Sequence, residues 1–186
     1  MLVKLLVISI ATSAIALFYA RWEYARRGKL SLLGLLLLCA MLFMPNLMLH
    51  YVFDYKLPST TLDYFGACVA MAGFALCLFG IFHFKSLAKM LCVDAGELTT
   101  SGPYRFGRNP QYVGWILFLL GWALNDWSWW CLAALLIVAV SLHLLVLIEE
   151  QHLRRVFGEP YVEFCRRVPR YWSSRSLNNA SAASDK

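Results

Sequence analysis

SGPYRFGRNPQYVG, residues 101–114, stands directly before a hydrophobic stretch and determines how the second half of the chain begins to fold. Pro110 suits the first turn of a helix, where its missing N–H has no intrahelical partner, and Asn109 before it is a residue type that caps helices. The start of that helix carries unpaired N–H groups and a partial positive charge, and Arg105 and Arg108 flank it. The sequence therefore predicts an anion-binding corner at a helix N-terminus.

The rest of the chain is strongly apolar. Hydrophobic residues make up 60% of the 186 residues, and the mean hydropathy is +0.60, whereas soluble domains use about 45–50% apolar residues. Long apolar blocks predict an all-α, polytopic membrane protein with about five transmembrane helices and a cytoplasmic C-terminal helix. The predicted spans are Leu2–Tyr19, Leu30–Val52, Leu62–Phe84, Gln111–Leu124 and Trp127–Ile148. Residues 1–172 are expected to form a single domain, followed by a disordered tail at 173–186.

The basic residues predict the orientation in the membrane. All Lys and Arg residues except Lys4 and Lys56 follow the first span, follow the third span or lie in the C-terminal tail. By the positive-inside rule the N-terminus lies outside and the C-terminus is cytoplasmic, in a bacterial inner membrane or the endoplasmic reticulum. The net charge of +6 suits an anionic cytoplasmic leaflet and requires no nucleic acid. A signal peptide is the alternative for Met1–Tyr19, but its cleavage would require export of the basic Arg21–Lys29 segment.

Neither a metal site nor a familiar nucleotide site is predicted. The six cysteines form no C-x-x-C pair and the four histidines are dispersed, so the cysteines are interpreted as small packing residues. The chain contains neither G-x-G-x-x-G nor G-x-x-x-x-G-K-[ST]. A cofactor would therefore be held without a Rossmann or P-loop motif.

Glycines recur at intervals of seven in two predicted spans. Gly66, Gly73 and Gly80 lie in the third span, and Gly114 and Gly121 in the fourth. Seven residues are nearly two helical turns, so each set forms one stripe. Small residues allow membrane helices to approach closely, which predicts that these two spans pack together. A groove that admits a lipid tail is the alternative.

The last two predicted spans form a hairpin with a short turn near Asn125–Asp126, so their outer ends meet at the cytoplasmic side. Asn109 opens this hairpin, and Glu149 and Glu150 close it. Adjacent helical side chains point about 100° apart, so the two carboxylates can meet different partners. The alternative is that both lie in headgroup water and pair with Arg154.

Two segments together, GPYRFGRNPQYVG at 102–114 and EEQHLRRVFGEPYVEFCRRVPR at 149–170, resemble the C-terminal signature of integral-membrane methyltransferases. This family groups isoprenylcysteine carboxyl methyltransferases with phospholipid N-methyltransferases. The resemblance covers about residues 98–170 and implies S-adenosyl-L-methionine bound between the last two spans, the loop before them and the C-terminal helix. The matching cofactor positions are Gly102, Pro103, Tyr104, Arg105, Arg108, Pro110, Tyr112, Gly114, Glu149 and Glu150.

Asn109 stands where many members of the family have histidine. The resemblance still implies a cofactor-binding position there, whereas the role of that histidine as a proton acceptor would be lost. Phe157, Gly158 and Tyr161 match the family's tail motif, where packing of the C-terminal helix over the site is expected.

The residue types suit methyl transfer. A glutamate can hold the cofactor's ammonium group or ribose hydroxyls, and Arg105, Arg108 or the helix N-terminus can hold its carboxylate. The two arginines are candidate catalytic residues together with His143, which lies seven residues before Glu150 and therefore about 10 Å deeper on nearly the same helix face. The alternative for His143 is a hydrogen bond to a neighbouring helix.

The resulting hypothesis is an S-adenosylmethionine-dependent methyltransferase that acts at the cytoplasmic face on a membrane lipid or a lipid-anchored acceptor. The positive potential of Arg105 and Arg108 favours an anionic head, such as a prenylcysteine-type carboxylate, over a phospholipid amine. Two alternatives are an NADPH-dependent membrane reductase related to sterol reductases and a non-enzymatic membrane adaptor or small transporter.

Overall fold

The computed structural model describes residues 1–52, 59–83, 100–125 and 127–172. Within these ranges the chain forms helices and turns and no strand, which confirms the all-α class. The elements are α1 (Leu2–Arg26), α2 (Leu32–Val52), α3 (Thr61–His83), the 3-10 helix η1 (Gly102–Arg105), α5 (Pro110–Asn125), α6 (Trp129–Phe157) and α7 (Glu159–Arg167). The predicted tail at 173–186, Lys56, Phe84, the first two motif residues at 98–99 and the turn residue Asp126 lie outside the described residues.

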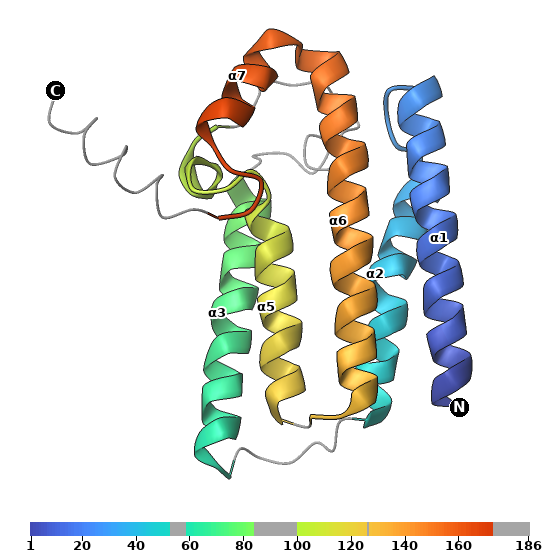
Figure 1. Ribbon diagram of the computed structural model, residues 1–186, viewed down its shortest axis with the longest axis vertical. Helices are drawn as coiled ribbons and strands as arrows, with labels where there is room; N and C mark the ends of the chain where they lie inside the picture. Colours follow the sequence, from blue (N-terminus) through green and yellow to red (C-terminus); the bar gives the residue numbers. More distant parts are fainter. Residues whose placement is uncertain (53–58, 84–99, 126, 173–186) are drawn as a thin grey trace, which may run out of the picture.

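The long helices run side by side as one bundle. The N-terminus lies at one end, and η1 and α7 lie at the other (Figure 1). Among the described residues, four helices are long and apolar enough to cross a membrane: α1, α2, α3 and α6. At 16 residues, α5 is shorter, about 24 Å at 1.5 Å per residue. A multi-pass protein with about five spans, the fourth of them short, agrees with this arrangement.

The helix that forms the last predicted span extends beyond Ile148. Helix α6 continues through Glu149 and Glu150 to Phe157, and both glutamates therefore lie inside the helix. No glycine or proline interrupts this stretch until Gly158, whose φ of +60° ends the helix. The continuous helix holds the two carboxylates in fixed positions beside α5.

Close packing between α3 and α5 confirms the prediction from the glycine stripes. A Cβ atom built on Gly73 would overlap the backbone nitrogen of Phe118 and lie 2.7 Å from the carbonyl oxygen of Gly114. A Cβ atom on Gly114 would in turn lie 2.6 Å from the carbonyl oxygen of Gly73. The helix backbones themselves occupy the stripe, which therefore offers no groove to a lipid tail.

The turn between α1 and α2 is fixed by a buried carboxylate. Glu23 is fully buried, and its Oε2 accepts the backbone N–H of Ser31 at 2.8 Å. The other oxygen pairs with Arg27 at 3.2 Å, and the hydroxyl oxygen of Ser31 accepts the N–H of Gly34 at 3.2 Å. These bonds satisfy donors at the start of α2 and hold the two helices as a hairpin.

Candidate active site

The site forms at the end of the bundle opposite the N-terminus, where η1, the start of α5, the upper part of α6 and the chain after α7 meet (Figure 1). Pro110 opens α5 as the sequence predicts. The carbonyl oxygen of Asn109 accepts the N–H of Val113 at 3.2 Å, so Asn109 stands immediately before the helix. Its side-chain amide donates to the carbonyl oxygen of Arg170 at 3.0 Å. Asn109 thus joins the start of α5 to the C-terminal segment.

Glu150 is held by two arginines from distant parts of the chain. Its Oε1 lies 3.0 Å from Nη1 of Arg108, and the two side chains are 7% and 9% exposed. Arg170 adds two parallel bonds of 2.9 and 2.8 Å, from Nε and Nη2 to the two carboxylate oxygens. This hydrogen bonding raises the pKa of Arg170. Glu150 therefore pairs with Arg108 and Arg170, whereas the alternative prediction gave it Arg154.

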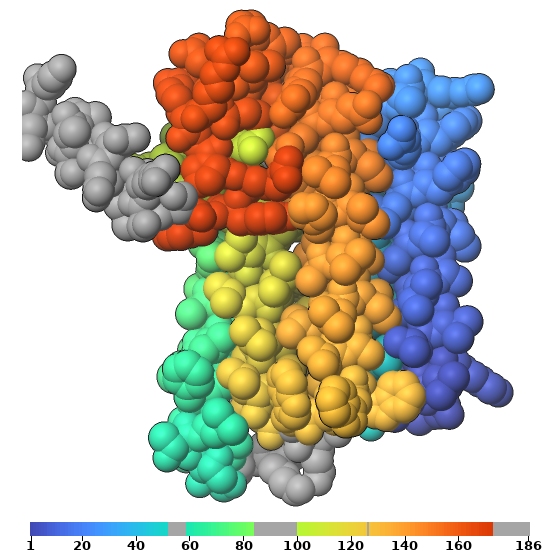
Figure 2. Space-filling model, in the orientation of Figure 1, coloured from blue at the N-terminus to red at the C-terminus, as the bar shows by residue number. Residues whose placement is uncertain are grey.

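Residues 168–172, here called the strap, turn back from α7 across the start of α5. The N–H of Arg108 donates to the carbonyl oxygen of Pro169 at 3.0 Å. A Cβ atom on Gly107 would overlap the carbonyl oxygen of Tyr171, and the rings of Phe106 and Trp172 stack at 5.5 Å. In Figure 2 the strap and α7 lie over the end of α5 and beside α6 on the face shown.

Glu149 has quite different surroundings from its neighbour. Both of its oxygens lie within hydrogen-bonding distance of the Tyr112 hydroxyl, at 2.9 and 3.1 Å. No cation pairs with Glu149 among the described residues, and its side chain is only partly buried. The helix geometry directs it about 100° away from Glu150. Of the two carboxylates, Glu149 is therefore the one that retains capacity for a bound cation.

A buried donor lies close to these groups. Nε of Arg108 is buried and has no hydrogen-bond partner within the described part of the chain. A buried guanidinium N–H without an acceptor is costly, and a carboxylate is the group that would satisfy it best. The residues present therefore fit a zwitterionic cofactor such as S-adenosylmethionine, with one donor and one acceptor for its two charges.

Several residues that were predicted to bind the cofactor contact α3 and support the site from that helix. The buried hydroxyl of Tyr104 lies 3.3 Å from the carbonyl oxygen of Gly80 and 3.0 Å from Oε1 of Gln111. Burial raises the pKa of Tyr104, which keeps the hydroxyl protonated. Gly102 has a φ of +60°, and a Cβ atom there would overlap the ring of His83. These contacts, with the buried Pro103 of the same turn, seat η1 on the end of α3.

The two remaining candidate catalytic residues lie at the edge of the cluster. Arg105 is exposed, and its guanidinium lies 5.1 Å from the centre of the Phe106 ring. His143 is also exposed, and its Nδ1 lies 2.7 Å from the hydroxyl of Tyr171. Burial raises the pKa of Tyr171, so its hydroxyl remains protonated. His143 thus contacts the strap, whereas the alternative prediction gave it a neighbouring helix.

Sequence reasoning missed the strap. Arg170 and Tyr171 supply contacts to Glu150 and His143, yet Arg170 is one of many basic residues in the tail. The available signal is Val168–Pro169, which ends α7 and turns the chain. The tail motif packs over the site as expected, through a buried cluster of Tyr104, Tyr161, Phe164 and Val168 with Phe157 against it.

The fold and this cluster define a multi-pass helical membrane protein with an ion-paired polar site at one end of its bundle. The model of the phospholipid methyltransferase family matches residues 62–160, more than half of the chain, and the chain belongs to this family. The match begins in α3 and ends at the first turn of α7, before the strap. No curated protein and no solved structure matches the chain.

Proposed function

We propose that this membrane methyltransferase transfers a methyl group from S-adenosyl-L-methionine to a lipid-borne acceptor at the strap end of the bundle. The proposal rests on two groups, each of which lacks one kind of partner among the described residues. The carboxylate of Glu149 has no cation, and the buried Nε of Arg108 has no hydrogen-bond acceptor. Membership of a methyltransferase family supports the same chemistry and does not favour a reductase or a non-enzymatic adaptor.

The two carboxylates have different roles, one in binding and one in positioning. Glu149, oriented by Tyr112, holds the cofactor's ammonium group or ribose hydroxyls, and Arg108 Nε holds its carboxylate. Glu150 is already saturated by Arg108 and Arg170. Its role is to position the Arg108 guanidinium and to fasten the strap over the site.

S-adenosylmethionine supplies an electrophilic methyl group on a sulfonium centre. In-line transfer of that group depends on alignment and on exclusion of water more than on acid–base assistance. The strap and α7 exclude water here, because Pro169, Arg170 and Tyr171 close directly on the start of α5 and on α6.

The charge balance bears on the acceptor. The charges of Arg108 and Arg170 are balanced by those of Glu149 and Glu150, and the remaining positive charge comes from exposed arginines such as Arg105 and Arg154. The potential that favoured a prenylcysteine-type carboxylate is therefore largely neutralised. A phospholipid amine becomes the favoured acceptor, and the prenylcysteine-type carboxylate is the second candidate on the strength of Arg105.

An amine acceptor must lose a proton, and His143 is the candidate to accept it. In the tautomer whose Nδ1–H donates to the Tyr171 hydroxyl, Nε2 carries the lone pair that a base needs. In that tautomer the contact with Tyr171 engages Nδ1 and leaves Nε2 for the proton of the acceptor.

The membrane side follows from the basic residues. The end of the bundle that holds the site also carries the basic ends of α1, α6 and α7. We place this end in the cytoplasm and the N-terminus outside, in a bacterial inner membrane or the endoplasmic reticulum.

The experiment supplies the purified protein, in phosphatidylcholine vesicles, with methyl-labelled S-adenosylmethionine and either phosphatidylethanolamine or a farnesylated cysteine acceptor. The expected result is label in the phosphatidylethanolamine headgroup, lost in Glu149→Gln and retained in the matched control Glu163→Gln, whose side chain is exposed on α7. Label in the farnesylated cysteine alone would select the second acceptor. No label in either acceptor, with reduction of a lipid by NADPH, would overturn the proposal.

A further inference from the structure

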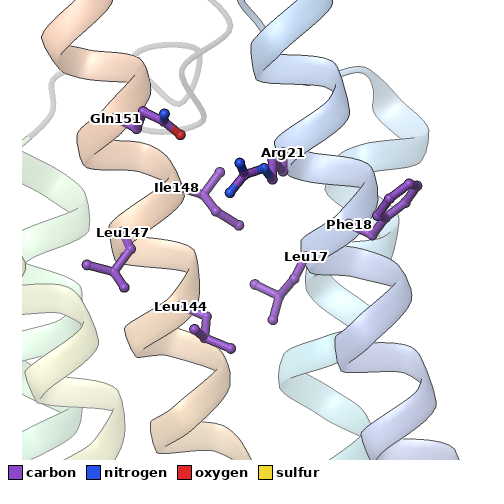
Figure 3. Close-up of a pocket in the computed structure, with 7 residues that line it drawn as sticks. All are labelled: Leu17, Phe18, Arg21, Leu144, Leu147, Ile148 and Gln151. Carbon is purple, nitrogen blue, oxygen red and sulfur yellow. The ribbon is translucent and has the colours of Figure 1, made fainter.

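A groove of about 360 Å³ runs between α1 and α6 on the outside of the bundle (Figure 3). This volume falls within the range of ligand pockets, roughly 300–1,000 Å³. Its apolar walls are Leu17 and Phe18 from α1 and Leu144, Leu147 and Ile148 from α6.

Polar groups lie at only one end of the groove. Arg21 of α1 and Gln151 of α6 occupy the end nearer the site, and the side chain of Arg21 points toward α6 (Figure 3). Arg21 is exposed, and among the described residues no carboxylate pairs with it. A cation at the mouth of an apolar groove is complementary to a molecule with one anionic head and one apolar tail.

The groove is separate from the methyl-transfer site. On α6, Leu147 and Gln151 lie two residues before and two residues after Glu149, so both point about 160° away from that carboxylate. An occupant of the groove therefore lies on the opposite face of α6 and does not reach the Glu149 carboxylate.

The spacing of α1 and α6 is set by a contact beyond the groove. Tyr24 of α1 is buried and stacks on the buried His152 of α6, with ring centres 4.5 Å apart. On α1 this contact lies three residues past Arg21, and on α6 it lies one residue past Gln151. The groove is therefore formed before any ligand binds, which reduces the entropic cost of binding.

We propose that this groove binds one acyl chain of an anionic membrane phospholipid, whose phosphate pairs with Arg21. The lipid stays bound to α1 and α6 and takes no part in the catalytic cycle. The inference does not depend on the proposed methyl transfer. A second copy of the chain suits the groove less well, because a twofold contact there would bring two Arg21 side chains and their basic neighbours together.

The test is native mass spectrometry of the full chain, released from detergent after titration with palmitoyl-oleoyl phosphatidylglycerol or with palmitoyl-oleoyl phosphatidylcholine. The expected result is preferential retention of one phosphatidylglycerol per chain. Arg21→Gln should weaken its binding about fivefold, the equivalent of about 1 kcal/mol. Arg26→Gln is the matched control, because Arg26 contacts Trp22 and does not line the groove.

A second pair of variants tests the apolar part. Leu147→Trp enlarges a side chain that lines the groove and should lower phosphatidylglycerol retention, whereas Leu36→Trp, on the exposed face of α2, should leave it unchanged. Equal retention of the two lipids by the parent protein, or equal losses in Arg21→Gln and Arg26→Gln, would overturn the proposal. A dimer that Leu147→Trp dissociates would assign the groove to a second copy and overturn it as well.

Discussion

The α3–α5 interface and the strap end of α6 are held together by opposite means. Between α3 and α5 the backbones touch, and Gly73 and Gly114 leave no room for even one additional carbon atom. At the strap end, two arginines from distant segments, Arg108 and Arg170, meet at Glu150 of α6. The first region depends on the absence of side chains and the second on their charges. The rigid apolar interface positions the start of α5, and the ionic one closes the site over it.

The largest expected effect is at the glycine interface. Gly73→Leu should lower the free energy of unfolding by more than about 4 kcal/mol, because its Cβ atom meets backbone that cannot move aside. Thermal unfolding in detergent measures this loss. Met71→Leu is the control, since Met71 is 74% exposed on the same helix. Equal melting of Gly73→Leu and the parent would show that the two helices do not pack through this stripe.

The next effect is at the ionic end. Glu150→Gln leaves Arg108 and Arg170 without a carboxylate, and breaking a buried ion pair costs about 3 kcal/mol or more. We expect a lower melting temperature and faster proteolysis at the strap. The exposed Glu163→Gln should melt like the parent. Melting and proteolysis of Glu150→Gln that match this control would remove Glu150 from the fastening of the strap.

The neighbouring carboxylate distinguishes binding from stability. Glu149→Gln should melt at or above the temperature of the parent, since no cation pairs with Glu149 among the described residues. Its affinity for S-adenosylmethionine should fall about tenfold, or about 1.4 kcal/mol, because a charge-assisted hydrogen bond is lost. Calorimetric titration measures the change. An unchanged affinity would mean that Glu149 does not bind the cofactor as proposed.

The smallest expected effect is at the contact between Tyr171 of the strap and His143 of α6. Tyr171→Phe removes the hydroxyl that lies 2.7 Å from His143 and should cost about 1 kcal/mol of stability. If His143 accepts the proton of an amine acceptor, the variant should also slow methyl transfer to phosphatidylethanolamine while leaving the affinity for S-adenosylmethionine unchanged. Loss of cofactor affinity in this variant would instead place Tyr171 in the cofactor site.

Much of the fold is predictable because it follows from periodic patterns. Apolar blocks give the spans, and glycines at intervals of seven give the α3–α5 pair. The predicted last span ends at Ile148 because hydrophobicity ends there, whereas helix α6 continues to Phe157 because no helix-breaking residue occurs before Gly158. The burial of Glu23 was also not predicted, because it depends on the N–H of Ser31, the residue immediately before α2.

The site was predictable in part. The meeting of Arg108 with Glu150 follows from the hairpin formed by α5 and α6. The division between Glu149 and Glu150 does not, because Arg170 reaches Glu150 only after the chain reverses at Pro169. One arginine in a tail with several others gives no sequence signal of which carboxylate it will meet.

The site at the strap end is proposed to bind S-adenosylmethionine, and calorimetric titration of the detergent-purified chain tests this claim. We predict that one S-adenosylmethionine binds per chain and that NADPH does not bind. Binding of NADPH in its place, or of neither molecule to well-folded protein, would contradict the claim.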